Sequence, residues 1–224
     1  MPERRRVRSF VRREGRLTPA QRRALETLLP RYGLQTTPPV WDLVKVFGRD
    51  AQRTLEIGFG NGENLLALAR AHADQDFIGI EVHRPGVGYL LNRLASEDVA
   101  NMRVICDDAQ EVLKRCMPDA SLDRVLLYFP DPWPKKRHHK RRLVQPEFVT
   151  LLAAKLKAGG LFHAATDWPE YAQHMTEVLS ATPEFSRITA VDAAMQGQTR
   201  SLTRFERRGI HLGHTVRELA FKRR

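Results

Sequence analysis

The sequence predicts an α/β domain built on a mostly parallel, doubly wound sheet with helices on both faces. Three observations predict this fold. From about residue 53, short apolar runs alternate with longer amphipathic stretches. A glycine-rich turn joins the first apolar run to the helix-length stretch after it. The chain of 224 residues, 42% of them hydrophobic, can fill one sizeable core.

Each of the first five strands is expected to lead into a helix. The strands are expected at about 53–57, 76–81, 102–106, 123–128 and 160–166, and the helices at about 62–73, 84–97, 109–117, 145–157 and 169–181. Two later apolar stretches, at about 185–191 and 215–222, have no helix-length segment between them. We expect them to pair antiparallel at one edge, which makes a seven-stranded sheet.

Residues 1–40 differ in character from the rest of the chain, so we expect a basic N-terminal extension followed by one domain over 41–224. The segment Thr18-Pro-Ala-Gln21 predicts the start of a short helix, because Thr is a good N-cap and Pro is tolerated in the first turn. Residues 1–16 are expected to be mobile.

The net charge of +11 is concentrated in two blocks. Residues 1–23 hold nine arginines against two glutamates, and residues 135–142 hold six cations and no acid. Like charges packed this closely repel one another unless a polyanion receives them, so a phosphate backbone is the expected partner. The alternative for either block alone is a solubilising tail or an ordinary basic loop.

Other classes of protein are disfavoured by the sequence. No apolar run is long enough for a membrane span, and the Arg-rich N-terminus lacks the apolar core of a secretory leader. The two cysteines match no zinc or redox spacing, and no metal is expected. We therefore expect a cytoplasmic protein, and a monomer.

The turn Gly58-Phe-Gly-Asn-Gly62 places glycines at positions 58, 60 and 62, directly after the first strand. Such a turn lets a ligand approach the backbone, although it can also simply close a tight connection. A dinucleotide site would have glycine at position 63, where Glu63 would instead repel a pyrophosphate. S-adenosyl-L-methionine, which carries an amino acid cation and a ribose but no phosphate, fits better.

Acids follow the first three strands. Glu56 can meet the amino or sulfonium cation, or it can be a partly exposed acid at a strand end. Glu81 can accept the hydroxyls of a ribose. Asp107 or Asp108 can accept the exocyclic amine of adenine, or can cap the next helix. Three acids after three successive strands favour an adenosyl ligand.

The fourth strand leads into Phe129-Pro-Asp-Pro-Trp-Pro-Lys-Lys136. Three prolines around one acid fix where Asp131 points. Trp133 offers a flat face, and the basic run that follows completes a site for a splayed-out base on a phosphate backbone. The alternative is a structural loop with Trp133 packed inward.

Across nearly its whole length the sequence resembles the bacterial tRNA (guanine-N7)-methyltransferases. The resemblance is carried by Arg8-Ser-Phe-Val-Arg-Arg13, Gly15-Arg-Leu17, Glu56-Ile-Gly-Phe-Gly-Asn-Gly62, Phe77-Ile-Gly-Ile-Glu-Val-His83, Phe129 to Lys136, Thr166-Asp-Trp168, Thr203-Arg-Phe-Glu206, Arg208-Gly209 and Gly213-His214. One departure is Arg217, where an aromatic residue is expected.

The resemblance implies a Rossmann-like methyltransferase fold and methyl transfer from S-adenosyl-L-methionine to N7 of a guanine in the variable loop of tRNA, at position 46. The cofactor contacts it implies are Glu56, Glu81, Asp108 and Asp131, with Asp131 also the catalytic candidate. It implies substrate contacts from Lys135, Asp167, Thr203, Arg204, Phe205 and Glu206, and RNA contacts from Arg137, His138, His139, Lys140, Arg141 and Arg142. Asp167 could otherwise cap a helix, and Glu206 could form a surface ion pair.

Guanine N7 presents an in-plane lone pair, so the reaction needs no general base, and alignment of the reactants can account for roughly 7–11 kcal/mol of the barrier. Asp131 can stabilise the positive charge that develops on the purine and can accept from guanine N1–H and the N2 amine. The competing functions are a methyltransferase with another acceptor, a nucleotide-dependent oxidoreductase, and a non-enzymatic RNA-binding protein of the same fold.

Overall fold

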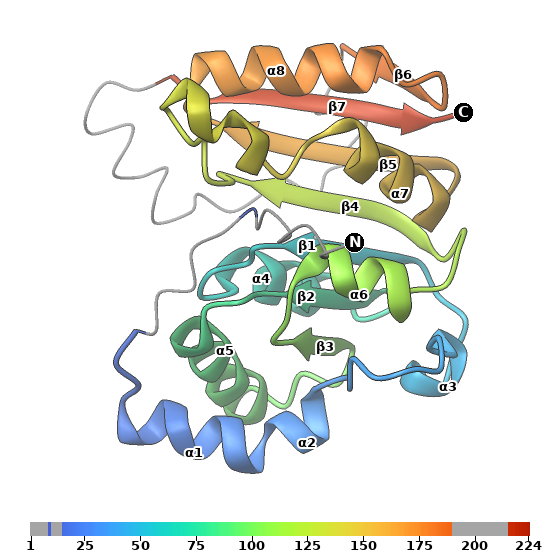
Figure 1. The fold of residues 1–224 in the computed structure, drawn as a ribbon. Helices are drawn as coiled ribbons and strands as arrows, with labels where there is room; N and C mark the ends of the chain where they lie inside the picture. Colours follow the sequence, from blue (N-terminus) through green and yellow to red (C-terminus); the bar gives the residue numbers. More distant parts are fainter. Residues whose placement is uncertain (1–8, 10–14, 190–214) are drawn as a thin grey trace, which may run out of the picture.

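The computed structural model describes Ser9, residues 15–189 and residues 215–224. Over these residues the chain forms a seven-stranded sheet between two layers of helices (Figure 1). The strands are β1 (Arg53–Ile57), β2 (Asp76–Ile80), β3 (Met102–Ile105), β4 (Leu122–Tyr128), β5 (Leu156–Thr166), β6 (Phe185–Ile188) and β7 (Arg217–Arg223). The helices are α1 (Pro19–Thr27), α2 (Leu29–Tyr32), α3 (Leu43–Phe47), α4 (Glu63–Ala71), α5 (Arg84–Ser96), α6 (Ala109–Arg115), α7 (Pro146–Lys155), α8 (Pro169–Ser180) and the 3-10 helix η1 (Lys136–Arg141).

The strands lie in the order β3-β2-β1-β4-β5-β7-β6. The first five pair in parallel, and β7 runs antiparallel to its two neighbours, β5 and β6. The predicted seven-stranded, mostly parallel sheet with an antiparallel pairing at its edge is confirmed. Because β1 to β5 are parallel, the loops that follow them meet at one edge of the sheet.

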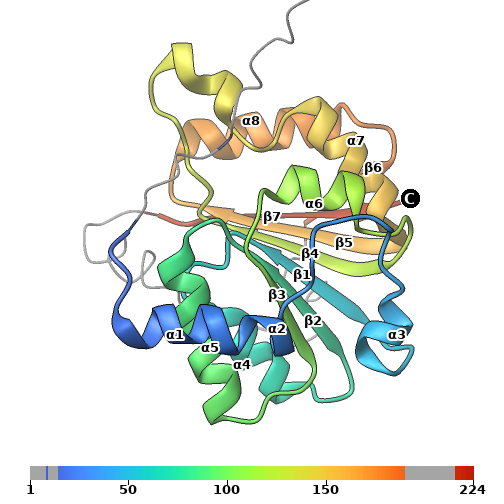
Figure 2. The same cartoon turned by 60° about the horizontal axis from the view of Figure 1, so that its bottom comes forward.

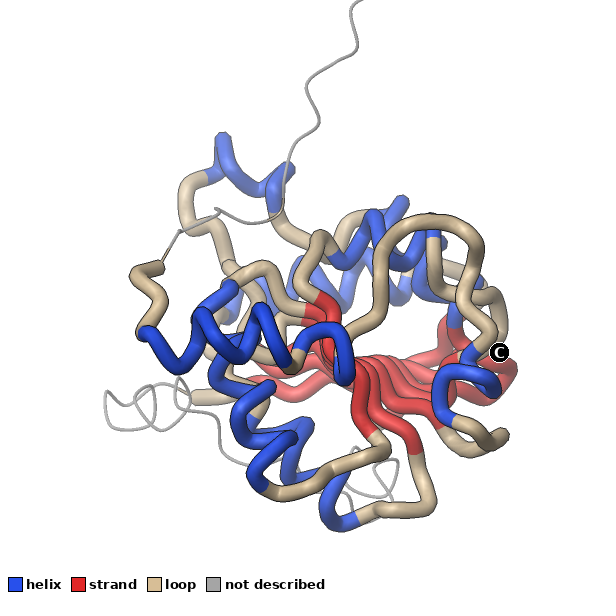
Figure 3. The backbone as a smooth tube through the Cα atoms, turned by 90° about the horizontal axis from the view of Figure 1, so that it is seen from below, coloured by secondary structure: helices blue, strands red, loops and turns tan. Residues whose placement is uncertain are grey.

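Helices cover both faces of the sheet (Figures 2 and 3), and an apolar layer lies between the sheet and each set of helices. One layer packs α6, α7 and α8 through residues such as Val149 and Met175, and the other packs α4 and α5 through Leu65 and Leu90. All residues of β1 and β2 are buried. Burial of every position is expected for central strands of a parallel sheet that is covered by helices on both faces.

The predicted short helix after Thr18 is confirmed as α1. The Thr18 hydroxyl accepts the N–H of Gln21 at 3.2 Å, and the Gln21 side chain accepts the N–H of Thr18 at 2.9 Å, which is a capping box. Helix α1 packs on α5, where a Cβ on Gly88 would lie 2.8 Å from the carbonyl oxygen of Gln21. Part of the N-terminal extension therefore packs closely on the sheet domain. The division of the chain at residue 40 stays a prediction.

Some boundaries differ from those predicted. We expected a helix to residue 157 and a strand from 160, but α7 ends at Lys155 and β5 begins at Leu156. Leu156 pairs with Leu122 across a bulge, and the backbone continues through Gly159 at φ 79°. The short helices α2, α3 and η1 were not predicted. Arg217, the departure from the family pattern, is exposed at the start of β7 and donates to the Thr215 carbonyl at 3.1 Å.

Candidate active site at the carboxyl edge of the sheet

The predicted site acids lie at the carboxyl ends of five neighbouring parallel strands. Glu56 lies near the end of β1, Glu81 follows β2, Asp108 follows β3, Asp131 follows β4 and Asp167 follows β5. The parallel pairing brings these ends to the same edge. The strand order that places β1 between β2 and β4 also creates a switch point there, where ligands bind in open α/β sheets.

The glycine turn after β1 depends on the conformational freedom of glycine. Gly58, Gly60 and Gly62 have φ values of 74°, 61° and 74°, in the left-handed region that L side chains rarely adopt. No described atom lies within 4 Å of the position that a Cβ would occupy at Gly58 or Gly60. A Cβ on Gly62 would instead lie 2.6 Å from Leu90. The turn is thus open at its first two glycines and packed against α5 at the third.

Gly86, which was not predicted, lets α5 approach this turn. A Cβ there would lie 2.0 Å from the carbonyl oxygen of Gly60. The sequence signal that could have found it is a glycine inside a helix, where it lowers helix stability and so needs another reason to be present.

Glu81 braces the same turn from the end of β2. Its Oε2 accepts the backbone N–H of Gly60 at 2.8 Å, and its Oε1 accepts the N–H groups of Val82 and His83 at 2.7 and 2.9 Å. Three backbone donors fix the orientation of this buried carboxylate. A carboxylate has about four lone-pair sites, and three are in use, so one site on Oε2 remains to accept a hydroxyl of a ribose.

Glu56 is 3% exposed, so the alternative of a partly exposed acid is wrong. Its Oε2 accepts a 2.9 Å hydrogen bond from Asn64 Nδ2. The pKa of Glu56 is raised to about 7: burial raises it most, the Asn64 hydrogen bond opposes the rise, and the negative charge of Glu81 adds a smaller increase. A buried carboxyl with such a pKa can ionise when a cation arrives. Asn64 was missed by sequence reasoning, because an asparagine in a first helical turn is common.

Asp108 caps α6, as its alternative role predicted. Its Oδ1 accepts the N–H groups of Gln110 and Glu111 at 2.8 and 3.4 Å. The neighbouring Asp107 accepts the N–H of Asp108 at 2.7 Å and the hydroxyl of Thr36 at 2.8 Å. Thr36 therefore adds a group from the N-terminal part of the chain to the end of β3, which the sequence did not predict.

The proline-rich segment after β4 is held in an unusual backbone conformation. Phe129 and Trp133, which flank Pro130, Asp131 and Pro132, have φ values of 50° and 47°. Positive φ at bulky residues is costly and persists where the surroundings enforce it, often at functional sites. Phe129 continues the sheet by donating to the Ala165 carbonyl at 2.7 Å. The exposed Asp131 thus lies between two residues, Phe129 and Trp133, whose backbone conformation is enforced by their surroundings.

The ring of Trp133, which was expected to offer a flat face to a base, is in contact with neighbouring side chains. The Arg141 guanidinium carbon lies 4.9 Å from the centroid of its ring, and His138 meets it edge-on at 5.7 Å. The indole N–H donates to the carbonyl of Ser9 at 3.0 Å. One face of the ring is therefore already covered by a cation, and the indole N–H already has a backbone partner.

The basic run forms η1, and its side chains have different surroundings. Lys135, Lys136, Arg137 and Lys140 are exposed, His138, His139 and Arg141 are half-buried, and Arg142 is 2% exposed. Arg142 was predicted to contact RNA, but in the structure its guanidinium is buried against Pro132 and α8. Desolvation and then the surrounding cations lower the pKa of His138, which favours its neutral form.

The remaining predicted residues are distributed as follows. Asp167 does not cap α8: the N-cap is Trp168, whose N–H donates to the Thr166 hydroxyl at 3.2 Å. Thr203, Arg204, Phe205 and Glu206 lie outside the described residues. Within residues 15–189 and 215–224, no group of acids, histidines and cysteines is arranged as a metal site.

Comparison with known proteins identifies the family. Residues 50–219 match the sequence model of a family described as "Putative methyltransferase". A tRNA (guanine-N(7)-)-methyltransferase of Alcanivorax borkumensis is 55% identical over 221 residues, covering 98% of this chain and 92% of the relative. One of Nitrosococcus oceani is 56% identical over 217 residues, covering 97% and 91%.

The chain belongs to the tRNA (guanine-N7)-methyltransferase family. Solved structures of more distant proteins share the fold of this methyltransferase. The aminoglycoside resistance methyltransferase NpmB1 is 18% identical with a TM-score of 0.56, covering 84% of this chain and 95% of that one. The 16S rRNA methyltransferase KamB is 14% identical with a TM-score of 0.56, covering 83% and 95%. The predicted Rossmann-like methyltransferase fold is confirmed.

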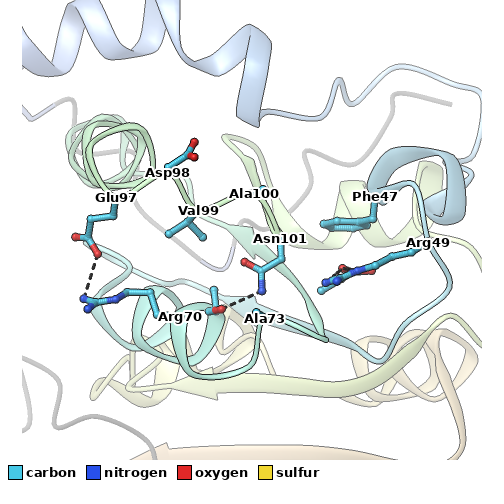
Figure 4. A pocket seen from close by; sticks show the side chains of 11 residues that line it. Phe47, Arg49, Arg70, Ala73, Glu97, Asp98, Val99, Ala100 and Asn101 are labelled. Carbon is cyan, nitrogen blue, oxygen red and sulfur yellow. Dashed lines mark hydrogen bonds and ion pairs between the residues drawn. The ribbon is translucent and has the colours of Figure 1, made fainter.

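A cavity of about 500 Å³ lies at the opposite edge of the sheet in this methyltransferase (Figure 4). Its charged residues pair with one another: Arg49 bonds Asp76 at 2.7 Å, and Arg70 lies 3.1 Å from Glu97. None of the predicted site residues lines it. We therefore place the active site at the carboxyl edge. Over the described residues, no helix has the length and apolar character needed to cross a lipid bilayer.

Proposed function

We propose that this protein transfers the methyl group of S-adenosyl-L-methionine to N7 of a guanine in the variable loop of tRNA, at position 46, forming 7-methylguanosine. The observation that carries the proposal is the row of acids at the carboxyl edge beside a rigid Pro-Asp-Pro segment and a basic helix. The identity of 52–56% to eight tRNA (guanine-N(7)-)-methyltransferases over nearly the whole chain supports the same activity. A monomeric, cytoplasmic protein is part of the proposal.

The residues at the edge fit the cofactor. Gly58 and Gly60 leave open space where a Cβ would stand, so a ligand can approach the backbone there. Glu81 presents an oriented carboxylate to a ribose. The buried Glu56 suits a cationic group, and Asp108 lies where the adenine end is expected. S-adenosyl-L-methionine carries no phosphate, so its site needs no phosphate-binding loop.

When bound, S-adenosyl-L-methionine supplies a methyl group on a sulfonium centre. The chain's task is then to hold guanine N7 in line with that methyl group. N7 attacks with a lone pair that carries no proton, so alignment rather than base catalysis accounts for the acceleration, on the order of 7–11 kcal/mol. This agrees with a site whose fixed groups are carboxylates and backbone amides.

Asp131 has two roles in this proposal. Its carboxylate can accept hydrogen bonds from guanine N1–H and the N2 amine, which selects guanine over adenine. It also stabilises the positive charge that develops on the purine, an effect that is larger in the transition state than before it. The backbone at Phe129 and Trp133 keeps the carboxylate in place without reorganisation.

The remaining groups bind the RNA. Lys135 lies in the loop after β4, which also carries Asp131, and Asp167 lies in the loop after β5. Both are proposed as substrate contacts, together with the segment Thr203 to Glu206. Two exposed cations of η1, Arg137 and Lys140, are proposed to contact phosphates. Each phosphate neutralised releases counterions, so affinity should fall steeply with salt.

The proposal is tested by incubating the protein with unmodified tRNA and methyl-labelled S-adenosyl-L-methionine and then mapping the modified base. The expected result is one 7-methylguanosine in the variable loop. Methylation of ribosomal RNA but not of tRNA would show another acceptor. Cofactor-dependent labelling of neither RNA, with tRNA still bound, would indicate a non-enzymatic RNA-binding protein.

A further inference from the structure

The basic run 136–142 is a 3-10 helix with its C-cap, and this geometry separates its side chains by direction. A 3-10 helix has 3.0 residues per turn, so residues three apart point the same way. His138 and Arg141 both contact Trp133. His139 and Arg142 both approach Glu170 of α8. Arg137 and Lys140 are exposed. A run of like charges is thus divided into three groups with different surroundings.

Arg142 has the most specific contacts of the run. Its Nε donates to the carbonyl oxygen of Pro132 at 2.9 Å. Its Nη2 lies 3.4 Å from Glu170 Oε1 and 3.1 Å from His139 Nε2. Its guanidinium carbon lies 5.1 Å from the centroid of the Tyr171 ring. One buried cation thus joins the proline-rich loop, η1 and the first turn of α8.

A buried charge is unfavourable unless it is paired and hydrogen-bonded, so this arrangement is sensitive to geometry. The carbonyl that Arg142 holds belongs to the residue directly after Asp131. Movement of that peptide would move the carboxylate, and a displacement of about 1 Å at a reacting group can reduce the rate on the order of a hundredfold. The planar guanidinium reaches several acceptors at fixed angles, which an ammonium group cannot do.

We propose that Arg142 is a positioning residue, which orients Asp131 through the Pro132 carbonyl and does not bind RNA. The inference rests on the proposed methyl transfer to tRNA. It divides the predicted RNA-contact run into an outer surface that binds phosphate, with Arg137 and Lys140, and an inner clamp, with Arg142. Substitutions on the two sides should therefore alter different measured quantities.

The test compares Arg142→Lys, which keeps the charge, with two other variants of the whole protein. Arg53→Lys is the matched control, because Arg53 is 5% exposed, pairs with Asp50 at 3.0 Å and lies at the opposite end of the sheet. Arg137→Gln represents the outer surface. Saturating turnover, the Kd for unmodified tRNA, the salt dependence of that Kd and the melting temperature are measured for each.

Arg142→Lys is expected to lower saturating turnover by about tenfold or more, with the tRNA Kd within about twofold of wild type and an unchanged salt slope. Arg53→Lys should keep wild-type turnover even if its melting temperature falls. Arg137→Gln should weaken tRNA binding and reduce the salt slope by about one. This pattern would separate positioning from RNA contact and from general loss of stability.

Two results would overturn the inference: wild-type turnover in Arg142→Lys, or a weaker Kd with a reduced salt slope and unchanged saturating turnover. If Arg142→Lys does not fold, Glu170→Gln decides, because Glu170 is 54% exposed and supports both His139 and Arg142. A lower turnover at an unchanged Kd would then support the clamp, and wild-type turnover would reject it. Absence of N7 methylation by the wild-type protein would instead reject the proposed function.

Discussion

Asn64 Nδ2 donates a 2.9 Å hydrogen bond to Glu56 Oε2 inside the fold, where neither side chain is more than 4% exposed. The pair joins the end of β1 to the first turn of α4, immediately beyond the glycine turn. The hydrogen-bond partner of this carboxyl is a neutral amide, which cannot compensate a negative charge as a cation would. This leaves a buried acid whose ionisation can be coupled to a cationic ligand.

Cofactor binding is expected to depend on pH through Glu56. Burial raises its pKa to about 7, so the carboxyl is protonated below that pH, and a cationic ligand must displace the proton. Affinity for S-adenosyl-L-methionine should therefore fall by up to about tenfold for each pH unit below 7 and level off above it. Calorimetry in buffers of different ionisation enthalpy should detect proton release at pH 6.

Glu56→Gln should flatten this pH profile and weaken binding at pH 8, whereas Glu26→Gln on the exposed face of α1 should reproduce the wild-type profile. The raised pKa means that Glu56 favours folding at low pH and that this contribution is lost as pH rises through about 7. The variant should therefore be more stable than wild type at pH 8, on the order of 3 kcal/mol without cofactor. An unchanged pH profile in Glu56→Gln would contradict the assignment.

Asp131→Asn is expected to lower saturating turnover about a hundredfold or more, because the substitution removes the charge that stabilises the developing cation and one acceptor for guanine. Cofactor affinity, measured by calorimetry, should change little. Asp98→Asn is the control, since Asp98 is also an exposed aspartate but lies at the other edge of the sheet, with a 91% exposed side chain. Wild-type turnover in Asp131→Asn would show that Asp131 is not the catalytic group.

Gly86→Ala should impair cofactor binding without touching the ligand directly. Its Cβ would lie 2.0 Å from the Gly60 carbonyl oxygen, so either α5 or the glycine turn must shift, at about 1–3 kcal/mol of unfolding free energy. Gly48→Ala is the matched control, because it strains a positive φ of 74° with no described atom near its Cβ. Gly48→Ala should lose stability and keep its cofactor Kd. Equal cofactor affinity in both variants would contradict the expectation that a side chain at position 86 displaces the glycine turn.

Lys140→Gln should weaken tRNA binding and lower the slope of log affinity against log salt by about one, because one phosphate contact is lost. Lys45→Gln is the control: Lys45 is 86% exposed on α3, beside the start of β1. Filter binding at four salt concentrations distinguishes the two. If both variants show the wild-type slope, η1 does not lie against the RNA backbone.

The sheet and the positions of the acids could be predicted because they follow from periodicity and connectivity. Apolar runs that alternate with helices give a parallel sheet, and parallel strands bring Glu56, Glu81 and Asp131 to one edge whatever the details of packing. Thr18 and Asp108 were recognisable as caps because capping depends on nearby residues alone.

Other features depend on contacts between distant segments and were not predictable. Thr36 and Asp107 are far apart in sequence, and Asn64 is distinguished only by the buried carboxyl beside it. The burial of Arg142 was missed because a run of basic residues in the sequence does not show which of its side chains point into the protein. Helices as short as α2, α3 and η1 give too little periodicity to be recognised.

Because η1 has a three-residue period, the direction of each side chain depends on its register along the segment. One residue inserted after Lys136 would rotate every later side chain by about 120°, without changing the number of charges. The two cations that now face solvent would then face Trp133, the residues that now contact Trp133 would face α8, and Arg142 would be turned away from Pro132. In this family, a relative that aligns without gaps across 136–142 can place the same positions against solvent, Trp133 and α8. In a relative with one extra residue there, different positions must face these three surroundings.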